Sequence, residues 1–186
     1  MARPKGNDNK ARERLLEAAG RGFRMGGYGG IGVDGLAKEA GLTSGAFYSH
    51  FGSKAQAFKA ALIDGLVFLR SGIAQMRAQF PDAWQKTFVD FYLKDRMQVE
   101  LAEACALPTF IGDAARADPE TRDAYSAEIL RLQEEIAQSL DGEDRERRAL
   151  VLMSLLAGGA GLARAVNNSE LRDAILATVT DAAKKI

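Results

Sequence analysis

The spacing of apolar residues along the chain predicts helices from end to end. Over residues 9–24, Leu15, Ala19 and Phe23 recur at every fourth position and lie on one face of a helix, while Arg12, Arg14 and Arg21 lie off that face. No stretch alternates apolar and polar residues between turn signals, so the pattern indicates no strands. We therefore predict an all-α fold of about nine helices.

Glycine and helix-capping residues set the limits of these helices. The glycine-rich run at 26–30 ends the first helix, and Gly41 and Gly52 each end a short one. Ser53 opens a Ser-x-x-Gln capping box, and Ser169 is the expected cap of the last helix. The helices are predicted over residues 9–24, 33–40, 44–51, 54–79, 108–117, 119–140, 144–166 and 169–184, with a further helix from 81 to a polar loop at 94–103.

Charge is distributed unevenly along a chain whose formal net charge is zero. Residues 1–60 hold ten Lys/Arg against five Asp/Glu, a balance of +5, and residues 61–186 hold fifteen against twenty, a balance of −5. A basic end on a neutral chain is typical of a protein that meets a polyanion there. The alternative, on which this imbalance alone does not decide, is that charged residues on solvated faces are unevenly distributed by chance.

One glycine motif suggests a nucleotide site but stands in the wrong context. Residues 27–32, Gly-Tyr-Gly-Gly-Ile-Gly, match the Gly-x-Gly-x-x-Gly pattern of dinucleotide-binding proteins. That site requires a strand before the motif within a βαβ unit, whereas here a helix precedes it. We interpret the glycines as a helix end followed by a tight turn.

The segment over residues 33–51 predicts a helix-turn-helix, because two short helices are joined through Gly41, Leu42 and Thr43. The second helix begins with small residues, which allow close approach to base edges in the major groove of DNA. Tyr48, His50 and the nearby Lys54 offer hydrogen-bond donors to phosphates. The alternative is an ordinary helical hairpin with His50 as a surface residue.

Residues 10 to about 62 resemble the N-terminal domain of the TetR family of bacterial transcriptional regulators (TetR/AcrR type). The resemblance is most specific over Gly41-Leu42-Thr43-Ser44-Gly45-Ala46-Phe47-Tyr48-Ser49-His50-Phe51-Gly52-Ser53-Lys54. It implies a homodimeric repressor that binds a palindromic DNA operator, with a larger C-terminal domain that binds a small ligand. By position it implies DNA contacts at Thr43, Ser44, Gly45, Tyr48, His50 and Lys54. Ile31 and Gly32 stand where the family often has Thr or Ser, so a hydroxyl cap and a phosphate contact are expected to be missing there.

We predict a helix-turn-helix DNA-binding domain over residues 1–53 and a ligand-binding and dimerisation domain over residues 54–186, linked by the helix at 54–79. An apolar pocket between helices is a usual ligand site. The candidate ligand-binding residues are the aromatics Trp84, Phe88, Phe91, Tyr92, Phe110 and Tyr125. For any one of these rings, filling the core is the alternative role.

The helix at 144–166 contains glycines that let two backbones approach closely, although each costs up to about 1 kcal/mol relative to Ala. We predict a helix–helix contact with a partner subunit; close packing within the monomer is the alternative. The predicted dimer-interface residues are Leu155, Gly158, Gly159, Leu162 and Leu176.

The few residues suited to covalent or metal chemistry exclude several functions. With Cys105 and His50 as the only cysteine and histidine, one chain cannot form a disulfide or a Cys/His zinc site. Cys105 is a candidate redox or electrophile sensor, but Glu100 and Glu103 disfavour its thiolate, and a buried, inert cysteine is the preferred interpretation. No acid–base or nucleophilic constellation is present, so we expect no enzyme activity, no metal and no cofactor.

We therefore predict a cytoplasmic, ligand-responsive regulator that represses transcription, without a membrane span. Its expected partners are double-stranded DNA, a second copy of itself and an unidentified small-molecule effector. The alternatives are an all-helical interaction protein without DNA binding and a redox sensor that acts through Cys105.

Overall fold

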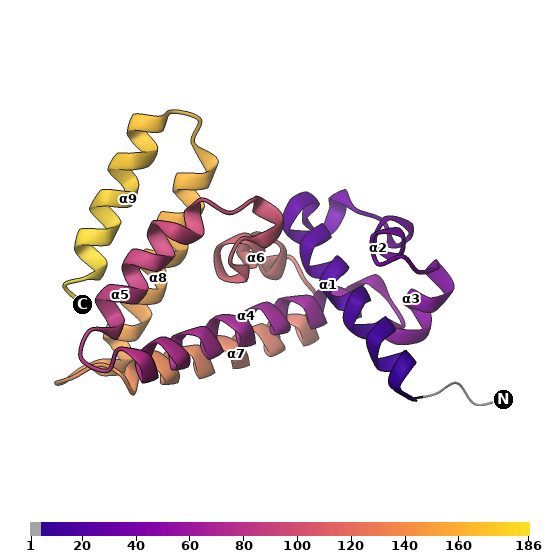
Figure 1. Ribbon diagram of the computed structural model, residues 1–186, viewed down its shortest axis with the longest axis horizontal. Helices are drawn as coiled ribbons and strands as arrows, with labels where there is room; N and C mark the ends of the chain where they lie inside the picture. Colours follow the sequence, from indigo (N-terminus) through magenta and orange to yellow (C-terminus); the bar gives the residue numbers. More distant parts are fainter. Residues whose placement is uncertain (1–4) are drawn as a thin grey trace.

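The computed structural model describes residues 5–186, and this part of the chain is helical without strands (Figure 1). The predicted all-α fold is confirmed. The first helices are α1 (Lys5–Gly30), α2 (Val33–Glu39), α3 (Ser44–Phe51) and α4 (Lys54–Gln79). They are followed by α5 (Trp84–Leu93), the short 3₁₀ helices η1 (Asp95–Met97) and η2 (Leu101–Glu103), α6 (Ala106–Ala115), α7 (Pro119–Ala137), α8 (Arg145–Ala165) and α9 (Ser169–Ala183).

The first helix extends further than the glycine-rich run predicted. Residues up to Gly30 keep helical hydrogen bonding, but Gly27 has φ +67° and ψ 175°, which divides α1 by a kink. Glycine tolerates this conformation because it has no Cβ. The prediction that the first helix ends before residue 26 is therefore wrong, because α1 continues to Gly30. The glycine-rich run does interrupt the helix, at Gly27.

Other boundaries also differ from the sequence prediction, among them the end of α7 at Ala137 rather than at 140. Helix α5 begins at Trp84 rather than at 81, and α6 begins at Ala106, which places Pro108 inside its first turn. The cap of α9 is Asn168, whose side chain accepts a hydrogen bond from the Leu171 N–H at 2.8 Å, and Ser169 is the first helical residue. The predicted polar loop at 94–103 contains η1 and η2.

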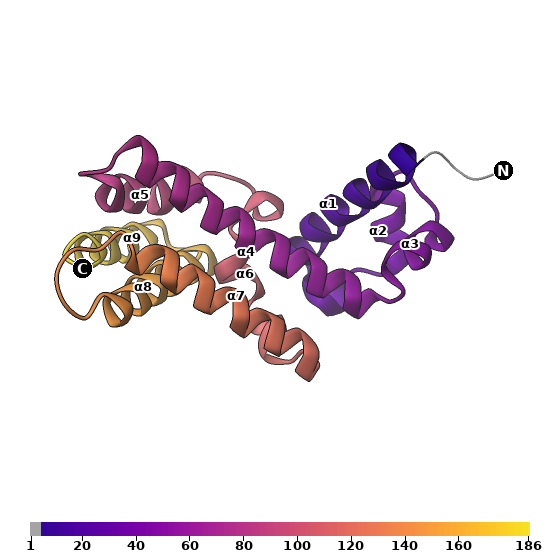
Figure 2. The same cartoon turned by 90° about the horizontal axis from the view of Figure 1, so that it is seen from below.

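Helix α4 runs the length of the molecule and joins its two ends. Its first half packs against α1, and the helix lies beside α7 from its first turn, where Gln56 contacts Glu120, to its last, where Arg77 pairs with Glu135 (Figures 1 and 2). A series of edge-to-face aromatic rings crosses from α1 through α4 to α6, with ring centroids 5.3 Å apart for Phe23–Phe58 and 5.6 Å apart for Phe58–Phe110. The hydrophobic core is therefore continuous across residue 54, where the domain division was predicted.

Helices α8 and α9 pack against each other at the end of the molecule opposite α2 and α3 (Figure 1). Of the described residues, those of α8 form a helix long and apolar enough to cross a membrane by length and composition alone. Core helices meet the same criterion, and α8 buries one face that includes Leu152, Leu156 and Ala160. Its packing against α6, α7 and α9 accounts for its apolar composition.

Candidate nucleic-acid interface

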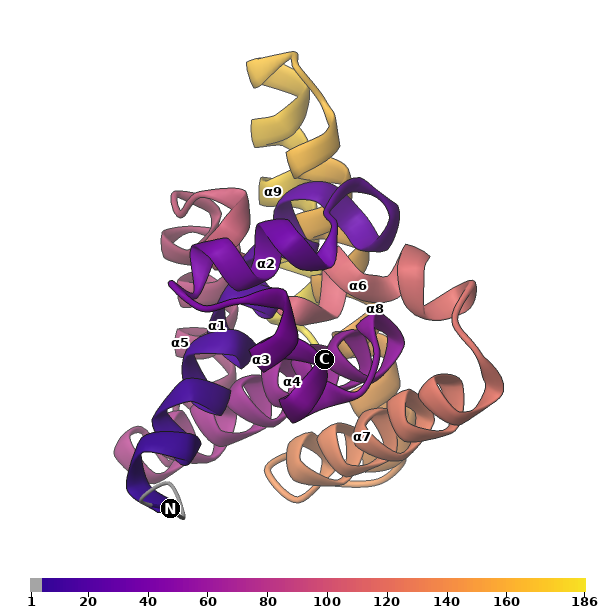
Figure 3. The same cartoon turned by 90° about the vertical axis from the view of Figure 1, so that its right-hand side faces the viewer.

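Helices α2 and α3 form the predicted helix-turn-helix at one end of the molecule (Figure 1), and this end faces the viewer in Figure 3. Leu36, Ala37 and Phe47 are buried between them. The turn is closed by a hydrogen bond of 2.8 Å from the Leu42 N–H to the Ala37 carbonyl, and Gly41 adopts φ +64°, which favours glycine. Local hydrogen bonds and a buried apolar contact thus fix the angle of α3.

The start of α3 presents a smooth, polar surface. Thr43 caps the helix, and its Oγ1 accepts a hydrogen bond from the Ala46 N–H at 3.2 Å. The Ser44 hydroxyl donates to Asp34 of α2, and Gly45 is exposed. A Cβ on Gly45 would have the Thr43 Oγ1, 3.8 Å away, as its nearest neighbour. The free protein therefore has room for a side chain at this position.

The three predicted phosphate-binding side chains differ in orientation. Tyr48 is 52% exposed, so its hydroxyl is accessible to a partner. The His50 side chain is only 12% exposed, and its Nε2 lies 3.7 Å from Oδ1 of Asp8 on α1. The Lys54 Nζ lies 4.7 Å from the centroid of the Tyr28 ring, a cation–π contact. Tyr48 is thus immediately available, whereas His50 and Lys54 contact α1 in this conformation.

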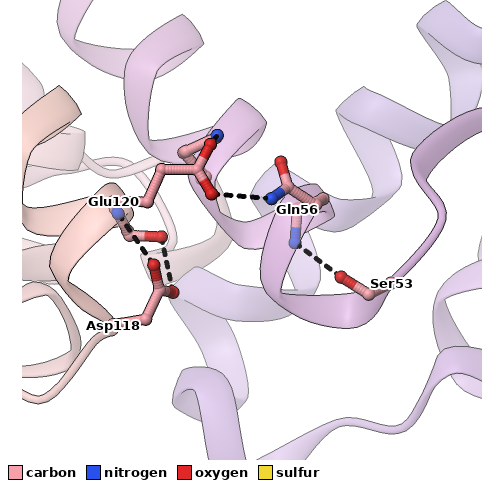
Figure 4. Close-up of polar contacts among 6 residues, drawn as sticks. Ser53, Gln56, Asp118 and Glu120 are labelled. Carbon is pink, nitrogen blue, oxygen red and sulfur yellow. Dashed lines mark hydrogen bonds and ion pairs between the residues drawn. The ribbon is translucent and has the colours of Figure 1, made fainter.

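The N-terminus of α2 lacks a hydroxyl cap, as the departure at Ile31 and Gly32 predicts. Gly32 is the N-cap residue, and no side chain of the described residues caps the helix there. The capping box at Ser53 is only half formed: its Oγ accepts from the Gln56 N–H at 3.1 Å, but the Gln56 side chain turns to Glu120 of α7 instead (Figure 4).

Polar contacts tie the helix-turn-helix end to the rest of the molecule. Glu120, in the first turn of α7, accepts a hydrogen bond from Gln56 Nε2 at 3.2 Å and pairs with Lys59 of α4. These two side chains lower the pKa of Glu120, with Lys59 the larger cause. At the kink of α1, the Tyr28 N–H donates to Oδ2 of Asp113 on α6 at 2.9 Å. A shift of α6 would therefore change a contact of α1, and a shift of α7 would change the contacts of α4.

A cleft of about 710 Å³ lies between α1, α4, α5 and the segment that leads into α6. Of the six aromatics predicted to bind a ligand, Phe88, Phe91 and Tyr92 line it. The other three lie elsewhere: Trp84 is buried with its Nε1 2.8 Å from the Ser139 carbonyl, Phe110 is buried in the series of aromatic rings, and Tyr125 packs beside the core on α7. These three rings have the alternative role, that of core filling.

The cleft also has walls that the sequence interpretation missed. Phe68 of α4 lines it and is 75% exposed, and the arginines Arg21, Arg24 and Arg96 line it too. In the sequence, Phe68 is a large apolar residue off the buried face of α4, and this position is the signal that could have identified it as a cleft residue. The sequence did not identify the arginines as cleft residues, because the cleft forms between α1 and helices that are distant from it in the chain.

Cys105 lines this cleft and is the half-buried N-cap residue of α6. Burial raises the pKa of its thiol, and the neighbouring Tyr92, Arg24 and Arg96 offset this only in part. The two glutamates invoked from sequence are not among the causes of the shift. A protonated thiol reacts slowly, so the structure favours the inert interpretation of Cys105 over the redox sensor. Among the described residues, no group of His, Cys, Asp and Glu side chains is arranged to hold a metal ion.

Helices α8 and α9 carry an apolar outer surface. Leu155, Gly158 and Leu162 recur along one face of α8, and Leu162 is 59% exposed. Gly159 points instead toward α9, where a Cβ would lie 2.7 Å from Cγ1 of Val179. Gly159 therefore packs within the monomer, and its assignment to the subunit interface is corrected. Leu176 of α9 is half-buried against the core.

These features define a class of protein: an all-helical protein with a helix-turn-helix of the DNA-binding type at one end and a core continuous with the remaining helices. Residues 15–61 match the family model described as bacterial regulatory proteins, tetR family. Residues 15–61 thus form a DNA-binding domain of the TetR family, and the rest of the chain shares its fold with solved structures of TetR-family regulators.

Solved structures share the fold over nearly the whole chain. A TetR-family regulator from Cytophaga hutchinsonii is 17% identical, with a TM-score of 0.78 over 99% of this chain and 98% of that one. One from Chloroflexus aurantiacus is 21% identical, with a TM-score of 0.76 over 94% of each chain. The reduced form of NemR from Escherichia coli is 18% identical, with a TM-score of 0.76 over 92% of this chain and 96% of that one. Among curated proteins, no sequence match was found.

Proposed function

We propose that this protein is a homodimeric transcriptional repressor that binds a palindromic operator through α3, and that a small apolar ligand modulates this binding. The observation that carries the proposal is the surface of α3. Its first turn combines an exposed Gly45 with a hydroxyl-capped start at Thr43, and Tyr48 projects from the same helix. This helix is short, firmly held by α2 and free of bulky side chains where a recognition helix meets base edges.

Gly45 and Ser44 are proposed to lie against bases, and Tyr48, His50 and Lys54 against phosphates. Lys54 must leave the Tyr28 ring to reach DNA. A partly exposed cation–π contact contributes only about 0.5–1 kcal/mol, so a phosphate can compete with it successfully. Capture of Lys54 by DNA would also free Tyr28, which is bonded through its N–H to Asp113 of α6.

The apolar outer face of α8 and α9 supports a dimer. A homodimer places two recognition helices on one duplex, and successive major grooves on one side of the DNA are roughly 34 Å apart. The α8–α9 pair lies at the opposite end of the molecule from α2 and α3 (Figure 1), which leaves both recognition helices open to DNA. The contact proposed here is formed by Leu155, Gly158 and Leu162 with their counterparts in the partner.

Ligand control requires that the ligand bind two arrangements of the dimer with different affinity. Helix α4 is the proposed lever, because its first turn belongs to the helix-turn-helix end and its later turns line the cleft. The contacts of Gln56 and Lys59 with Glu120 connect the same end to α7. A change in the cleft therefore has a direct structural route to the spacing of the two recognition helices.

An unbiased selection of operators from random duplexes tests the proposal. The expected product is a palindrome whose half-sites are one helical turn or a multiple apart, and the footprint should be protected by a dimer. Binding to the selected duplex should be at least about a thousandfold tighter than to a scrambled one. Recovery of no preferred sequence, with the protein shown to be folded and dimeric, would contradict the proposal.

A further inference from the structure

Two buried hydrogen-bond donors in the cleft lack an oxygen or nitrogen partner among the described residues. They are the Nε of Arg24 on α1 and the hydroxyl of Tyr92 on α5, whose polar neighbour is the Cys105 thiol, a weak hydrogen-bonding group. Tyr92 is 3% exposed, and burial is the main cause that raises its pKa, so the hydroxyl keeps its proton. Buried polar groups are nearly always hydrogen-bonded in folded proteins. Two such donors on one cleft indicate that the cleft receives acceptor atoms from a ligand.

Arg24 also lacks a carboxylate partner. No Asp or Glu of the described residues forms an ion pair with its guanidinium, whereas Arg21, one turn earlier in α1, pairs with Glu39 and Glu103. The Arg24 guanidinium lies 5.3 Å from the centroid of the Phe110 ring. This cation–π contact forms no hydrogen bond, so it does not satisfy the N–H groups of the guanidinium, which can bind an anion.

The acidic side chains on the cleft lie at its rim. Glu13, Glu17 and Asp64 are exposed, and Glu103 is neutralised by Arg21. The charge of Asp64 partly offsets the lowering of the Arg24 pKa by burial, but Asp64 forms no ion pair with Arg24. The inner end of the cleft, in contrast, contains Arg24, Arg96 and the Tyr92 hydroxyl around the protonated Cys105. The electrostatic preference at the inner end is therefore for a negative group.

Two glycines leave room for the Arg24 side chain. A Cβ on Gly20 would lie 2.9 Å from its Nη1, and a Cβ on Gly65 would lie 3.1 Å from its Nη2 and collide with Ala106. Both glycines lie within helices, where glycine costs helix stability relative to alanine. The space that they provide holds a guanidinium in a fixed position beside the cleft, which is the arrangement expected of an anion receptor.

The rest of the cleft is apolar and open to a ligand of moderate size. Phe68, Phe91 and Met76 line it, and the exposed Phe68 ring has an unused apolar face. A volume of about 710 Å³ falls within the range of small-molecule sites.

The geometry points to an effector that is an apolar molecule with one carboxylate group, whose carboxylate binds Arg24 and the Tyr92 hydroxyl while its body lies between Phe68, Phe91 and Met76. This inference rests on the proposed function and names the chemical class of its ligand. Arg24 belongs to α1, and the apolar walls belong to α4 and α5. The ligand thus links α1 directly to α4 and α5. Its contact on α1, Arg24, lies three residues before the kink at Gly27.

A matched pair of probes tests the chemistry: 2-naphthylacetate and its uncharged amide, 2-naphthylacetamide, titrated into the dimer by calorimetry. The acid should bind at least about tenfold more tightly than the amide. Arg24→Gln should remove at least tenfold from the affinity for the acid and leave the affinity for the amide unchanged within about twofold. Tyr92→Phe should weaken acid binding less, because the hydroxyl makes one hydrogen bond.

Arg70→Gln is the matched control. Arg70 of α4 also has a buried Nε without a partner among the described residues, but it lies outside the cleft lining, so this variant should bind the acid as the wild type does. Arg24→Lys keeps the charge, loses the planar fork and should fall between wild type and Arg24→Gln, which tests the inference even if Arg24→Gln folds poorly. Cys105→Ala should bind the acid normally, since the thiol is not the receptor.

Several results would overturn the inference: equal affinity for acid and amide, no binding of the acid at its solubility limit, or equal losses in Arg24→Gln and Arg70→Gln. If operator affinity responds to uncharged ligands but not to acids, only the ligand class is wrong. If no ligand of any charge that binds the protein alters operator affinity at saturation, ligand control itself fails, and with it that part of the proposed function.

Discussion

Two helix pairs at opposite ends of the molecule differ mainly in the chemistry of their outer faces. The α2–α3 pair buries Leu36, Ala37 and Phe47 and exposes small or polar residues together with the Tyr48 ring, whereas α8 exposes Leu150 and Leu162. Both pairs are held together by apolar contacts, so packing alone does not distinguish them. Their outer faces do: a polar surface without bulky side chains suits a nucleic acid, and an apolar stripe suits another protein surface.

The comparison is tested most strongly at two adjacent glycines of α8. Gly159→Leu should destabilise the monomer by roughly 2–3 kcal/mol or more, because the new side chain meets Val179 of α9 at a position with no free space. Gly158→Leu should leave the unfolding free energy nearly unchanged or raised, since a Cβ there meets no described atom within 4 Å, and should weaken the dimer instead. Denaturant unfolding and sedimentation separate the two effects. If the Gly159→Leu dimer dissociates without any loss of monomer stability, Gly159 does not pack within the monomer as described.

A charge placed on the apolar stripe should separate the subunits without unfolding them. Leu162→Glu would bury a carboxylate in the proposed interface, and sedimentation should show monomer with an unchanged helical circular dichroism spectrum. Leu130→Glu on α7, a similarly exposed leucine outside the proposed interface, is the control and should remain dimeric. If both variants or neither dissociate, α8 is not the contact.

A smaller effect is expected at the junction between the helix-turn-helix end and α7. The pKa of Glu120 is lowered, first by Lys59 and then by Gln56, so its ionised form stabilises the folded state. This contribution is fully present above the ordinary carboxyl pKa of 4.5 and is lost as the pH falls through the lowered folded-state value. Glu120→Gln should therefore lower the melting temperature slightly at pH 7, and the difference from wild type should vanish under acidic conditions. A difference that stays constant with pH would show that the charge of Glu120 is not involved.

The sequence was most informative where local signals act over a few residues. The limits of α3 and α4 were predicted correctly, because Thr43 and Ser53 cap these helices and Gly41 and Gly52 separate them. The DNA-contact residues lie on such a local motif, and their assignment remains a prediction that mutagenesis can test.

What the sequence could not provide depends on contacts between distant segments. The Gln56 side chain has an ideal local partner in the capping box, yet it binds Glu120, 64 residues away. Gly159 looked like an interface residue because the presence of Val179 opposite it follows only from the fold. The cleft likewise combines α1 with α4 and α5, so the unpaired Arg24 became visible only in three dimensions.

The central claim, that α3 reads DNA, is tested most directly by salt titrations on the operator and a scrambled duplex with Gly45→Leu and Lys54→Ala. Gly45 has room for a side chain in the free protein, so Gly45→Leu should fold normally yet lose preference for the operator while it keeps electrostatic binding to any duplex. Lys54→Ala should weaken both duplexes alike and reduce the slope of log affinity against log salt by about one unit for each phosphate that the protein no longer neutralises. Wild-type affinity and specificity in both variants would contradict the account, because α3 would then not enter the groove.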